Sequence, residues 1–210
     1  MKHVVLLGDS VFDNAAYVAG GPDVVRQLRE ALGPDQAATL AATDGAVTTG
    51  ILRQLDVIPA DATHLVTGVG GNDALRAASV LGDSARSVGD ALDQLGAVQS
   101  AFHTDYAAML DAILARNLPT AVCTIYHPRF TDLDQRRRSA TALSVLNDII
   151  TEAAFSRRLA LLDLRLICNH DEDFANPIEP SARGGYKIAS AIRDFVARPE
   201  EMPRRSQVFV

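Results

Sequence analysis

The sequence predicts an α/β fold in which helices pack on both faces of a five-stranded parallel sheet. Five short apolar runs are separated by segments with helical periodicity. These runs do not alternate with polar residues, which is typical of parallel strands covered on both faces. Strands that alternate with helices indicate a doubly wound sheet with right-handed crossovers. With 210 residues, of which 48% are hydrophobic, the chain is long enough for one large domain.

The strands are predicted from the apolar runs. The first run ends in Gly8-Asp9-Ser10, a glycine followed by an acid and a serine. The second run is weakly apolar, whereas the later ones are strong. We expect the five strands at residues 3–7, 37–41, 64–69, 120–126 and 159–164.

The helices are predicted from apolar spacing together with start and stop signals. Pro22 suits the first turn of a helix and Gly33 suits its end. Three glycines divide the long segment 74–116, so we expect two or three helical pieces there. Thr131-x-x-Asp134 resembles a capping box that opens a further helix. The expected helices are 22–32, 48–57, 74–116, 131–156 and 186–196.

We expect a single domain at residues 1–197 and a C-terminal tail at 198–210. The tail contains two prolines, so we expect it to be loose, although 208–210 could dock elsewhere. No long apolar signal segment and no run of about 18 apolar residues is present, so we predict no membrane span and a cytoplasmic location.

Charge and cysteine content exclude several classes of function. The net charge of −6 argues against a nucleic-acid partner, because no basic stripe could neutralise phosphates. The basic run 136–138 follows Asp132 and Asp134 and is interpreted as a solvated helix face. Cys123 and Cys168 lack C-x-x-C spacing, which favours buried, reduced thiols over a zinc site. We therefore expect neither a metal nor a cofactor.

The residues that follow the strands indicate the chemistry. Because the carboxyl ends of parallel strands meet at one edge, Ser10 is a candidate nucleophile there. The alternative is an ordinary turn in which Asp9 or Ser10 caps the next helix. A glycine N–H and an asparagine amide beside such a serine could surround a developing oxyanion. The same edge is expected to hold Asp44, Gly45, Thr48, Thr49, Asn72, Asp73, His127, His170, Asp171 and the segment 176–181.

Gly8-Asp9-Ser10, Gly45 and Gly70-x-Asn72-Asp73, in this order and spacing, resemble the GDSL or SGNH hydrolase superfamily. The resemblance extends over residues 4–192. It implies a three-layer α/β/α, flavodoxin-like sandwich with a five-stranded parallel sheet. It also implies hydrolysis of esters and acetyl groups on lipids, sugars or small esters. By this likeness Ser10 would be the nucleophile, with Gly45 and Asn72 completing the oxyanion hole.

The last motif of that family, Asp-x-x-His-Pro, is altered in this chain. The matching segment is Asn176-x-x-Glu179-Pro180, and the glycines and helix that follow it support the register. Asn176 therefore stands for the aspartate and Glu179 for the histidine. The chemistry of an Asn-Pro turn suggests that Asn176 holds its loop.

Three alternatives follow for the base. Glu179 could accept the serine proton if burial raised its pKa. His127 and His170 follow the fourth and fifth strands and lie at the same edge. If no efficient base exists, the crevice would only bind its ligand. Asp9 is interpreted as a structural hydrogen-bonding group beneath Ser10.

The sequence thus predicts a serine ester hydrolase that forms an acyl-enzyme on Ser10. Its substrate would be a small-molecule carboxylic ester or an O-acetylated compound, and its base would be Glu179 or a nearby histidine. The alternative is a non-catalytic, ligand-binding member of the same fold. A base within about 2.6–3.2 Å of Ser10 Oγ would favour the enzyme. The pattern does not indicate an oligomeric state.

Overall fold

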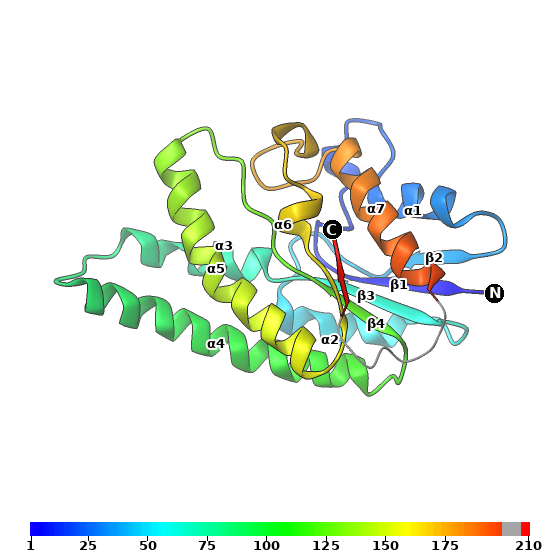
Figure 1. Cartoon of the computed structure of the whole chain (residues 1–210), viewed down its shortest axis with the longest axis horizontal. Coiled ribbons are helices and arrows are strands. Elements are labelled where there is room, and N and C mark those ends of the chain that lie inside the picture. Colours follow the sequence, from blue (N-terminus) through cyan, green and yellow to red (C-terminus); the bar gives the residue numbers. More distant parts are fainter. Residues whose placement is uncertain (199–206) are drawn as a thin grey trace.

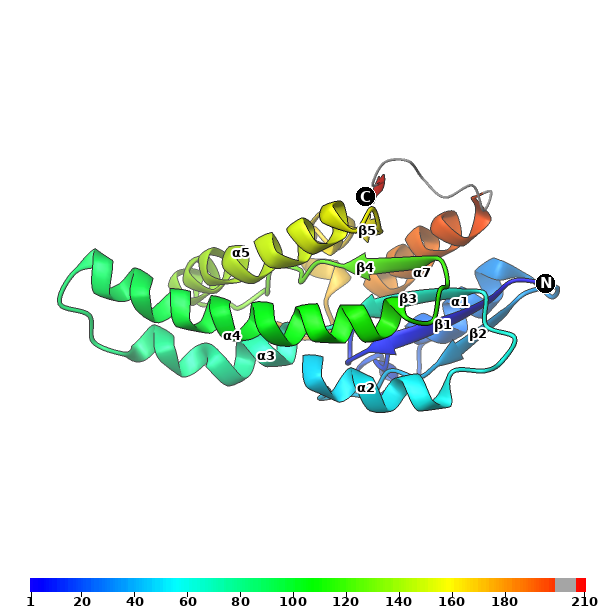
Figure 2. The same cartoon turned by 90° about the horizontal axis from the view of Figure 1, so that it is seen from below.

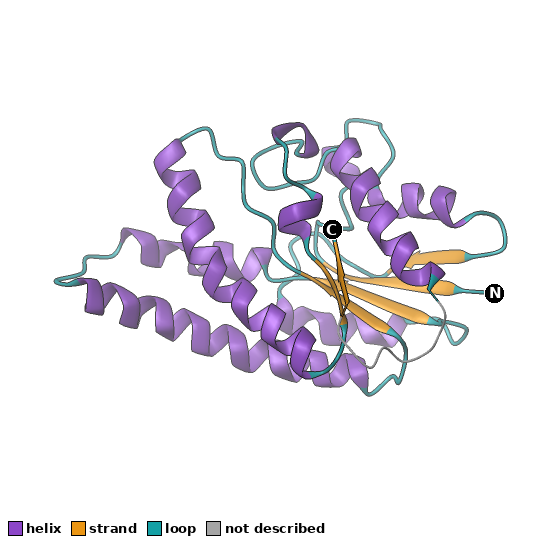
Figure 3. Ribbon diagram, in the orientation of Figure 1, coloured by secondary structure: helices purple, strands orange, loops and turns teal. Residues whose placement is uncertain are grey.

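The computed structural model describes residues 1–198 and 207–210. Its centre is a parallel sheet with helices on both faces (Figures 1 and 3). The strands pair in the order β2-β1-β3-β4-β5-β6, and every pairing is parallel. Their bounds are His3–Gly8 (β1), Ala37–Leu40 (β2), His64–Gly68 (β3), Thr120–Cys123 (β4), Ala160–Leu162 (β5) and Gln207–Phe209 (β6). The five predicted strands and the α/β class are confirmed.

The expected count of five strands was wrong, because part of the C-terminal tail forms β6. Phe209 is in register with Leu162 of β5, and the N–H of Asp163 donates to the Phe209 carbonyl at 2.9 Å. The Phe209 ring also packs edge-on against Phe195. Valine and phenylalanine favour strands, and they pair here with the otherwise open edge of β5. The tail's two prolines lie outside the described residues.

The helices follow the predicted order with shifted bounds. They are α1 (Val24–Leu32), α2 (Ile51–Gln54), α3 (Gly71–Ala77), α4 (Val88–Leu114), α5 (Leu133–Ser156), α6 (Leu164–Ile167) and α7 (Ala182–Ala197). Short 3-10 turns are η1 (Ala15–Tyr17), η2 (Thr48–Gly50), η3 (Leu55–Val57), η4 (Ala78–Gly82) and η5 (Asp171–Asp173).

Three details of the helix prediction need correction. Gly89 and Gly96 lie inside α4, since the apolar face of that helix outweighs the low helix propensity of glycine. The N-cap of α5 is Asp132 and not Thr131, because the Asp132 carboxylate accepts two backbone N–H groups. Helix α7 begins four residues early, after its N-cap Ser181.

The layers follow from the two faces of the sheet. Every residue of β1 is buried, and alternate side chains enter opposite cores. Val4 and Leu6 pack in the core under α1 and α7. Val5 and Leu7 pack in the core under α2, α4 and α5. This is the predicted three-layer α/β/α arrangement, and its strand order reverses between β1 and β3, where a crevice forms.

The helices α3, α4 and α5 extend well beyond the carboxyl ends of the strands (Figures 1 and 2). With 27 residues, α4 is about 40 Å long at 1.5 Å per residue. Its buried residues, from Phe102 to Ile113, lie in its C-terminal half. Its length does not make it a membrane span, since none of the described helices is apolar enough over a sufficient length to cross a bilayer. The three helices form an extension beside the crevice.

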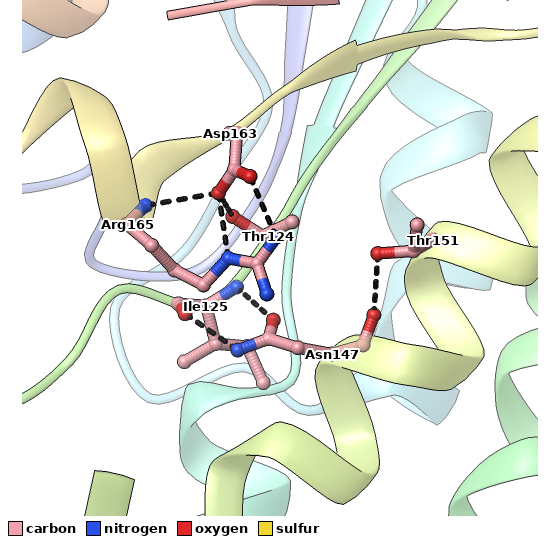
Figure 4. A network of polar contacts seen from close by, with 6 residues as sticks. All are labelled: Thr124, Ile125, Asn147, Thr151, Asp163 and Arg165. Atoms are coloured by element: carbon pink, nitrogen blue, oxygen red, sulfur yellow. Dashed lines mark hydrogen bonds and ion pairs between the residues drawn. The ribbon is translucent and has the colours of Figure 1, made fainter.

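A polar network ties α5 to the end of β4 (Figure 4). Asn147 accepts the N–H of Ile125 at 2.7 Å and donates to its carbonyl at 2.8 Å. Thr124 Oγ1 donates to Asp163 Oδ1 at 2.9 Å, and Arg165 forms two short contacts with the same carboxylate. These hydrogen bonds hold the backbone just after β4 against α5 and against Asp163, which follows β5.

Candidate active site

Ser10 is positioned by the backbone at the end of β1. Gly8 has φ +145°, and a Cβ atom there would lie 1.9 Å from the Gly68 carbonyl oxygen of β3. The side-chain amide of Gln54 accepts the Gly8 N–H and donates to the Gly8 carbonyl, both at 2.7 Å. The close approach to Gly68 and the two hydrogen bonds of the Gln54 amide therefore fix the chain two residues before Ser10.

Asp9 closes the turn beneath Ser10. Its N–H donates to the Gly68 carbonyl at 3.1 Å, and its carboxylate accepts the N–H of Val11 at 3.0 Å. Burial raises the pKa of Asp9 to about 7, against the opposing hydrogen bond from Val11, and the nearby Glu179 charge adds to the rise. These contacts agree with the structural role expected for Asp9.

Ser10 and Glu179 are in direct contact. Ser10 Oγ donates to Glu179 Oε1 at 3.0 Å, although 169 positions separate the two residues in the sequence. Both are buried, with exposed fractions of 7% and 6%. Among the described residues, Glu179 Oε2 has no hydrogen-bond partner. The carboxylate thus faces the serine in a poorly solvated place.

The pKa of Glu179 is raised to about 7. Burial is the main cause, because it disfavours the charged form. The hydrogen bond from Ser10 opposes the rise, and the charge of Asp44 adds to it. Glu179 therefore changes its charge near neutral pH, where an unperturbed glutamate would already be ionised.

The two histidines considered as bases lie elsewhere. Within the described part of the chain, neither His127 nor His170 has a hydrogen bond to Ser10. His127 is half-buried, and its pKa is lowered by burial and by the charges of Arg165 and Arg129. His170 is exposed, and its backbone N–H donates to Asp173 at 3.0 Å. Of the three candidate bases, the fold brings Glu179 to Ser10.

Asn176 shapes the loop that carries Glu179. Its side-chain oxygen accepts the N–H groups of Ile178 and Glu179 at 2.9 and 3.0 Å, which is an Asx-turn. The Tyr126 hydroxyl donates to the Ile178 carbonyl at 2.6 Å. Asn176 thus holds the backbone of the turn, in agreement with the loop role suggested by the sequence.

The same loop is anchored by a buried ion pair. The carboxylate of Asp173, which is fully buried, contacts Lys187 Nζ at 2.6 Å and Arg183 Nε at 3.3 Å. Gly184 sits so close that a Cβ atom there would lie 2.1 Å from the Asp173 carbonyl oxygen. Helix α7 therefore fixes the loop by charge and by close backbone contact.

The expected oxyanion-hole residues lie on two segments tied together. Asn72 Nδ2 donates to the Ala46 carbonyl at 3.0 Å. The carboxylate of Asp73 accepts the N–H of Thr48 at 3.0 Å to Oδ2 and 3.3 Å to Oδ1. Gly45 lies in the same loop with φ +76° and open space around it. The start of α3 therefore orients the loop that contains Gly45.

A cavity of about 390 Å³ opens beside Ser10 and Glu179. Asn72 and Asp9 also line it, next to the strand ends. Most of the remaining wall is apolar and comes from α3, η4, α4 and α5. Among the described residues, no group of three or more His, Cys, Asp or Glu side chains could hold a metal ion.

Sequence reasoning missed several residues that position the site. Gln54 stands 46 positions from Gly8, and no local pattern marks it as a partner. Asp173 and Lys187 were also missed, whereas Gly184 served only to support the register of the last motif. The close contact of Gly184 with the Asp173 carbonyl, which leaves no room for a Cβ atom, became visible only in the structure.

The fold and site geometry define a class. A buried serine hydrogen-bonded to a carboxylate lies at the carboxyl edge of a parallel sheet, in a cavity that Asn72 also lines, and this edge is where α/β folds carry their reactive groups. A family model described as GDSL-like Lipase/Acylhydrolase matches residues 6–185. The chain belongs to this family, which confirms the resemblance found in the sequence.

Solved structures share the fold at low sequence identity. The lipase Lip_vut3 from a goat rumen metagenome has a TM-score of 0.71 and 17% identity, over 93% of this chain and 97% of that chain. A lipolytic G-D-S-L family protein from Veillonella parvula has a TM-score of 0.69 and 14% identity, over 94% and 100%. Phospholipase A1 from Streptomyces albidoflavus has a TM-score of 0.61 and 17% identity, over 91% and 99%. No curated protein sequence matches the chain.

Proposed function

We propose that this protein hydrolyses carboxylic esters through an acyl-enzyme on Ser10, with Glu179 as the general base. The observation that carries the proposal is the 3.0 Å hydrogen bond from Ser10 Oγ to Glu179 Oε1. A serine hydroxyl needs a base within such reach, and a base works best when its pKa is near the working pH. The pKa of Glu179, about 7, meets that condition.

The first half-reaction begins when Ser10 Oγ attacks the ester carbonyl carbon while Glu179 takes the hydroxyl proton. The carbonyl oxygen becomes an oxyanion, which the backbone N–H groups of Ser10 and Gly45 and the amide of Asn72 stabilise. The loss of one such donor typically costs about 3–4 kcal/mol of transition-state stabilisation. The bond to the alcohol then breaks, and protonated Glu179 returns the proton to the leaving alkoxide.

The second half-reaction repeats these roles with water. Glu179 takes a proton from water as the water oxygen attacks the acyl carbon. The oxyanion collapses, the bond to Ser10 Oγ breaks, and the serine recovers its proton from Glu179. The products are the free acid and the alcohol, and the sequence of steps needs no cofactor. Asn176 contributes by holding the turn that presents Glu179.

The test is the hydrolysis of a short p-nitrophenyl ester from about pH 4 to about pH 10. Wild type is expected to gain activity as the pH rises through about 7, because Glu179 must be ionised to accept the proton. Ser10→Ala should abolish the activity, and Glu179→Gln should lower it by roughly 10²–10⁴-fold. His127→Ala should leave both rate and profile unchanged.

Two outcomes would contradict the proposal. A pH profile that disappears in His127→Ala and persists in Glu179→Gln would assign the base to the histidine. Equal rates for wild type and Ser10→Ala, on this ester and on a panel of acetyl esters, would favour the non-catalytic ligand-binding protein.

A further inference from the structure

We propose that the cavity beside Ser10 binds the acyl chain of the ester as an extended, uncharged hydrocarbon. The preferred substrates would then be medium- to long-chain fatty acyl esters and not O-acetyl groups. This inference rests on the proposed function, because it places the acyl carbon at Ser10.

The first argument is the chemistry of the cavity wall. Of the described residues that line it, three carry charge: Asp9 and Glu179 beside Ser10, and Arg138 on the outer part of α5. The wall between them is formed by apolar side chains of α3, η4, α4, α5 and the loop after β4. These side chains include Leu75, Val80, Leu81, Leu95, Val98, Ile125, Leu143 and Leu146. Such a wall offers few partners to a sugar and suits a hydrocarbon.

The second argument is size. If a methylene group takes about the volume of a water molecule, roughly 30 Å³, a cavity of about 390 Å³ holds on the order of a dozen methylenes. The lining of α5 extends from Leu146 to Gln135, which is about 16 Å at 1.5 Å per residue. An acetyl group would leave most of this space unfilled.

The third argument is the apolar stripe of α4. Phe102, Val98, Leu95, Leu92 and Val88 recur at helical spacing along one face. Phe102, at the sheet, is 4% exposed, whereas Leu92 and Val88 are 62% and 78% exposed. Leu95 and Val98, between them, line the cavity. The stripe therefore continues from the core past the cavity to an open end, where a bound chain would cover apolar surface now in contact with solvent.

The surroundings of Ser10 place the hydrocarbon on the acyl side of the ester and not on its alcohol side. The region of Asp44 and Tyr17 is polar and exposed, and their side chains are hydrogen-bonded at 2.7 Å. The charge of Asp44 acts on Glu179, which is the group that protonates the leaving alcohol. A polar alcohol suits this open side, and the hydrocarbon suits the cavity.

The test compares two ester series at concentrations below micelle formation. In the first series the alcohol is p-nitrophenol and the acyl chain has 2, 4, 8, 12 or 16 carbons. In the second series the acyl group is acetate and the alcohol is lengthened. We expect kcat/KM to rise at least 30-fold from 2 to about 8–12 carbons in the first series and to change less than threefold in the second. A flat first series, or a rise confined to the second, would overturn the assignment.

Matched variants test whether the acyl hydrocarbon lies in this cavity. Ala142→Phe and Val98→Phe insert bulk into the cavity, whereas Ala140 and Ala97, on the same helices, do not line it. The first two variants should lower kcat/KM for the 12-carbon ester at least tenfold and that for the acetate less than threefold. Ala140→Phe and Ala97→Phe should change neither. Equal losses for short and long esters in the cavity variants would overturn the proposal.

A binding measurement separates this inference from the proposed function. Methyl dodecanoate should displace the dye Nile red from the Ser10→Ala protein, and Ala142→Phe should weaken that displacement at least tenfold. If this result is obtained with a wild type that hydrolyses no ester, the hydrocarbon site stands and the hydrolase fails. If wild type hydrolyses short esters and its Ser10→Ala variant binds no hydrocarbon ester, the hydrocarbon site fails and the hydrolase stands.

Discussion

The two halves of the candidate site are built in different ways. Ser10 follows β1, a fully buried strand, and its place is set by backbone contacts of Gly8 with Gly68 and Gln54. Glu179 lies in a loop outside the sheet, which is held by the Asx-turn of Asn176 and by the ion pair of Asp173 with Lys187.

This difference indicates which half of the site tolerates a change of side chain. The position of Ser10 depends on the sheet itself, so the Gly8-Asp9-Ser10 motif stays recognisable. The position of residue 179 depends on loop contacts that do not specify which side chain it carries. Under the proposed function, a carboxylate can therefore serve as the base at position 179, because its surroundings raise its pKa.

The raised pKa values of Asp9 and Glu179, both about 7, link the site to stability. In the unfolded chain such carboxyl groups titrate near pH 4. Between about pH 4 and about pH 7 the folded protein binds more protons than the unfolded one, so the free energy of unfolding falls as the pH rises. The state in which Glu179 is ionised and able to act as a base is the less stable one.

The largest expected effect breaks the Ser10 half. In Gly8→Ala the added Cβ would meet the Gly68 carbonyl at 1.9 Å, at φ +145°, so we expect a loss of more than about 4 kcal/mol or failure to fold. Gly33→Ala is the matched control, because Gly33 also has positive φ but has open space. With φ +81° and ψ 179°, Gly33→Ala should cost about 1–3 kcal/mol in denaturant unfolding. Equal losses would show that backbone conformation, and not the contact with β3, sets this half.

Removal of the amide beside Gly8 should have the next largest effect. Gln54→Ala leaves the buried N–H and carbonyl of Gly8 without their partner, which costs about 1–3 kcal/mol for a buried group. Displacement of Ser10 should also lower kcat. Gln36→Ala is the control, since Gln36 caps the end of α1 away from the site. Unchanged stability and kcat in Gln54→Ala would contradict the role given to this amide.

The Glu179 half is tested by Lys187→Met. Of its ion-pair partners among residues 1–198 and 207–210, the fully buried Asp173 carboxylate then keeps Arg183, so we expect a loss of about 1–3 kcal/mol. Because the loop carries Glu179 and not Ser10, kcat should fall while the protein stays folded. Arg193→Met, on the same helix but paired with exposed Asp194, should change stability by less than about 0.5 kcal/mol. The same small loss in both variants would sink the anchoring role of Asp173.

The smallest expected effect sharpens the electrostatic part of the comparison. The charge of Asp44 raises the pKa of Glu179, so Asp44→Asn should move the rise in activity to lower pH by less than about one unit. Asp35→Asn, which removes an equal charge from a turn between α1 and β2, should leave the profile in place. The measurement is kcat/KM against pH, and a shift to higher pH in Asp44→Asn would have the wrong sign.

The sequence was informative where local pattern determines structure. The strands, the α/β class and the Gly8-Asp9-Ser10 turn follow from residues adjacent in the chain. The Ser10–Glu179 contact joins positions 169 apart, so register with the family motif could suggest it but periodicity could not. The sixth strand was missed because it depends on the edge of β5.

The central claim is that Glu179 activates Ser10, and the rate at which an alkyl fluorophosphonate labels Ser10 tests it most directly. The serine oxygen displaces fluoride, so the measurement reports its nucleophilicity without a turnover step. The account predicts that labelling in wild type accelerates as the pH rises through about 7, that Glu179→Gln slows it at least 100-fold, and that His127→Ala leaves it unchanged. Labelling of Glu179→Gln at the wild-type rate, with the same pH dependence, would contradict the claim.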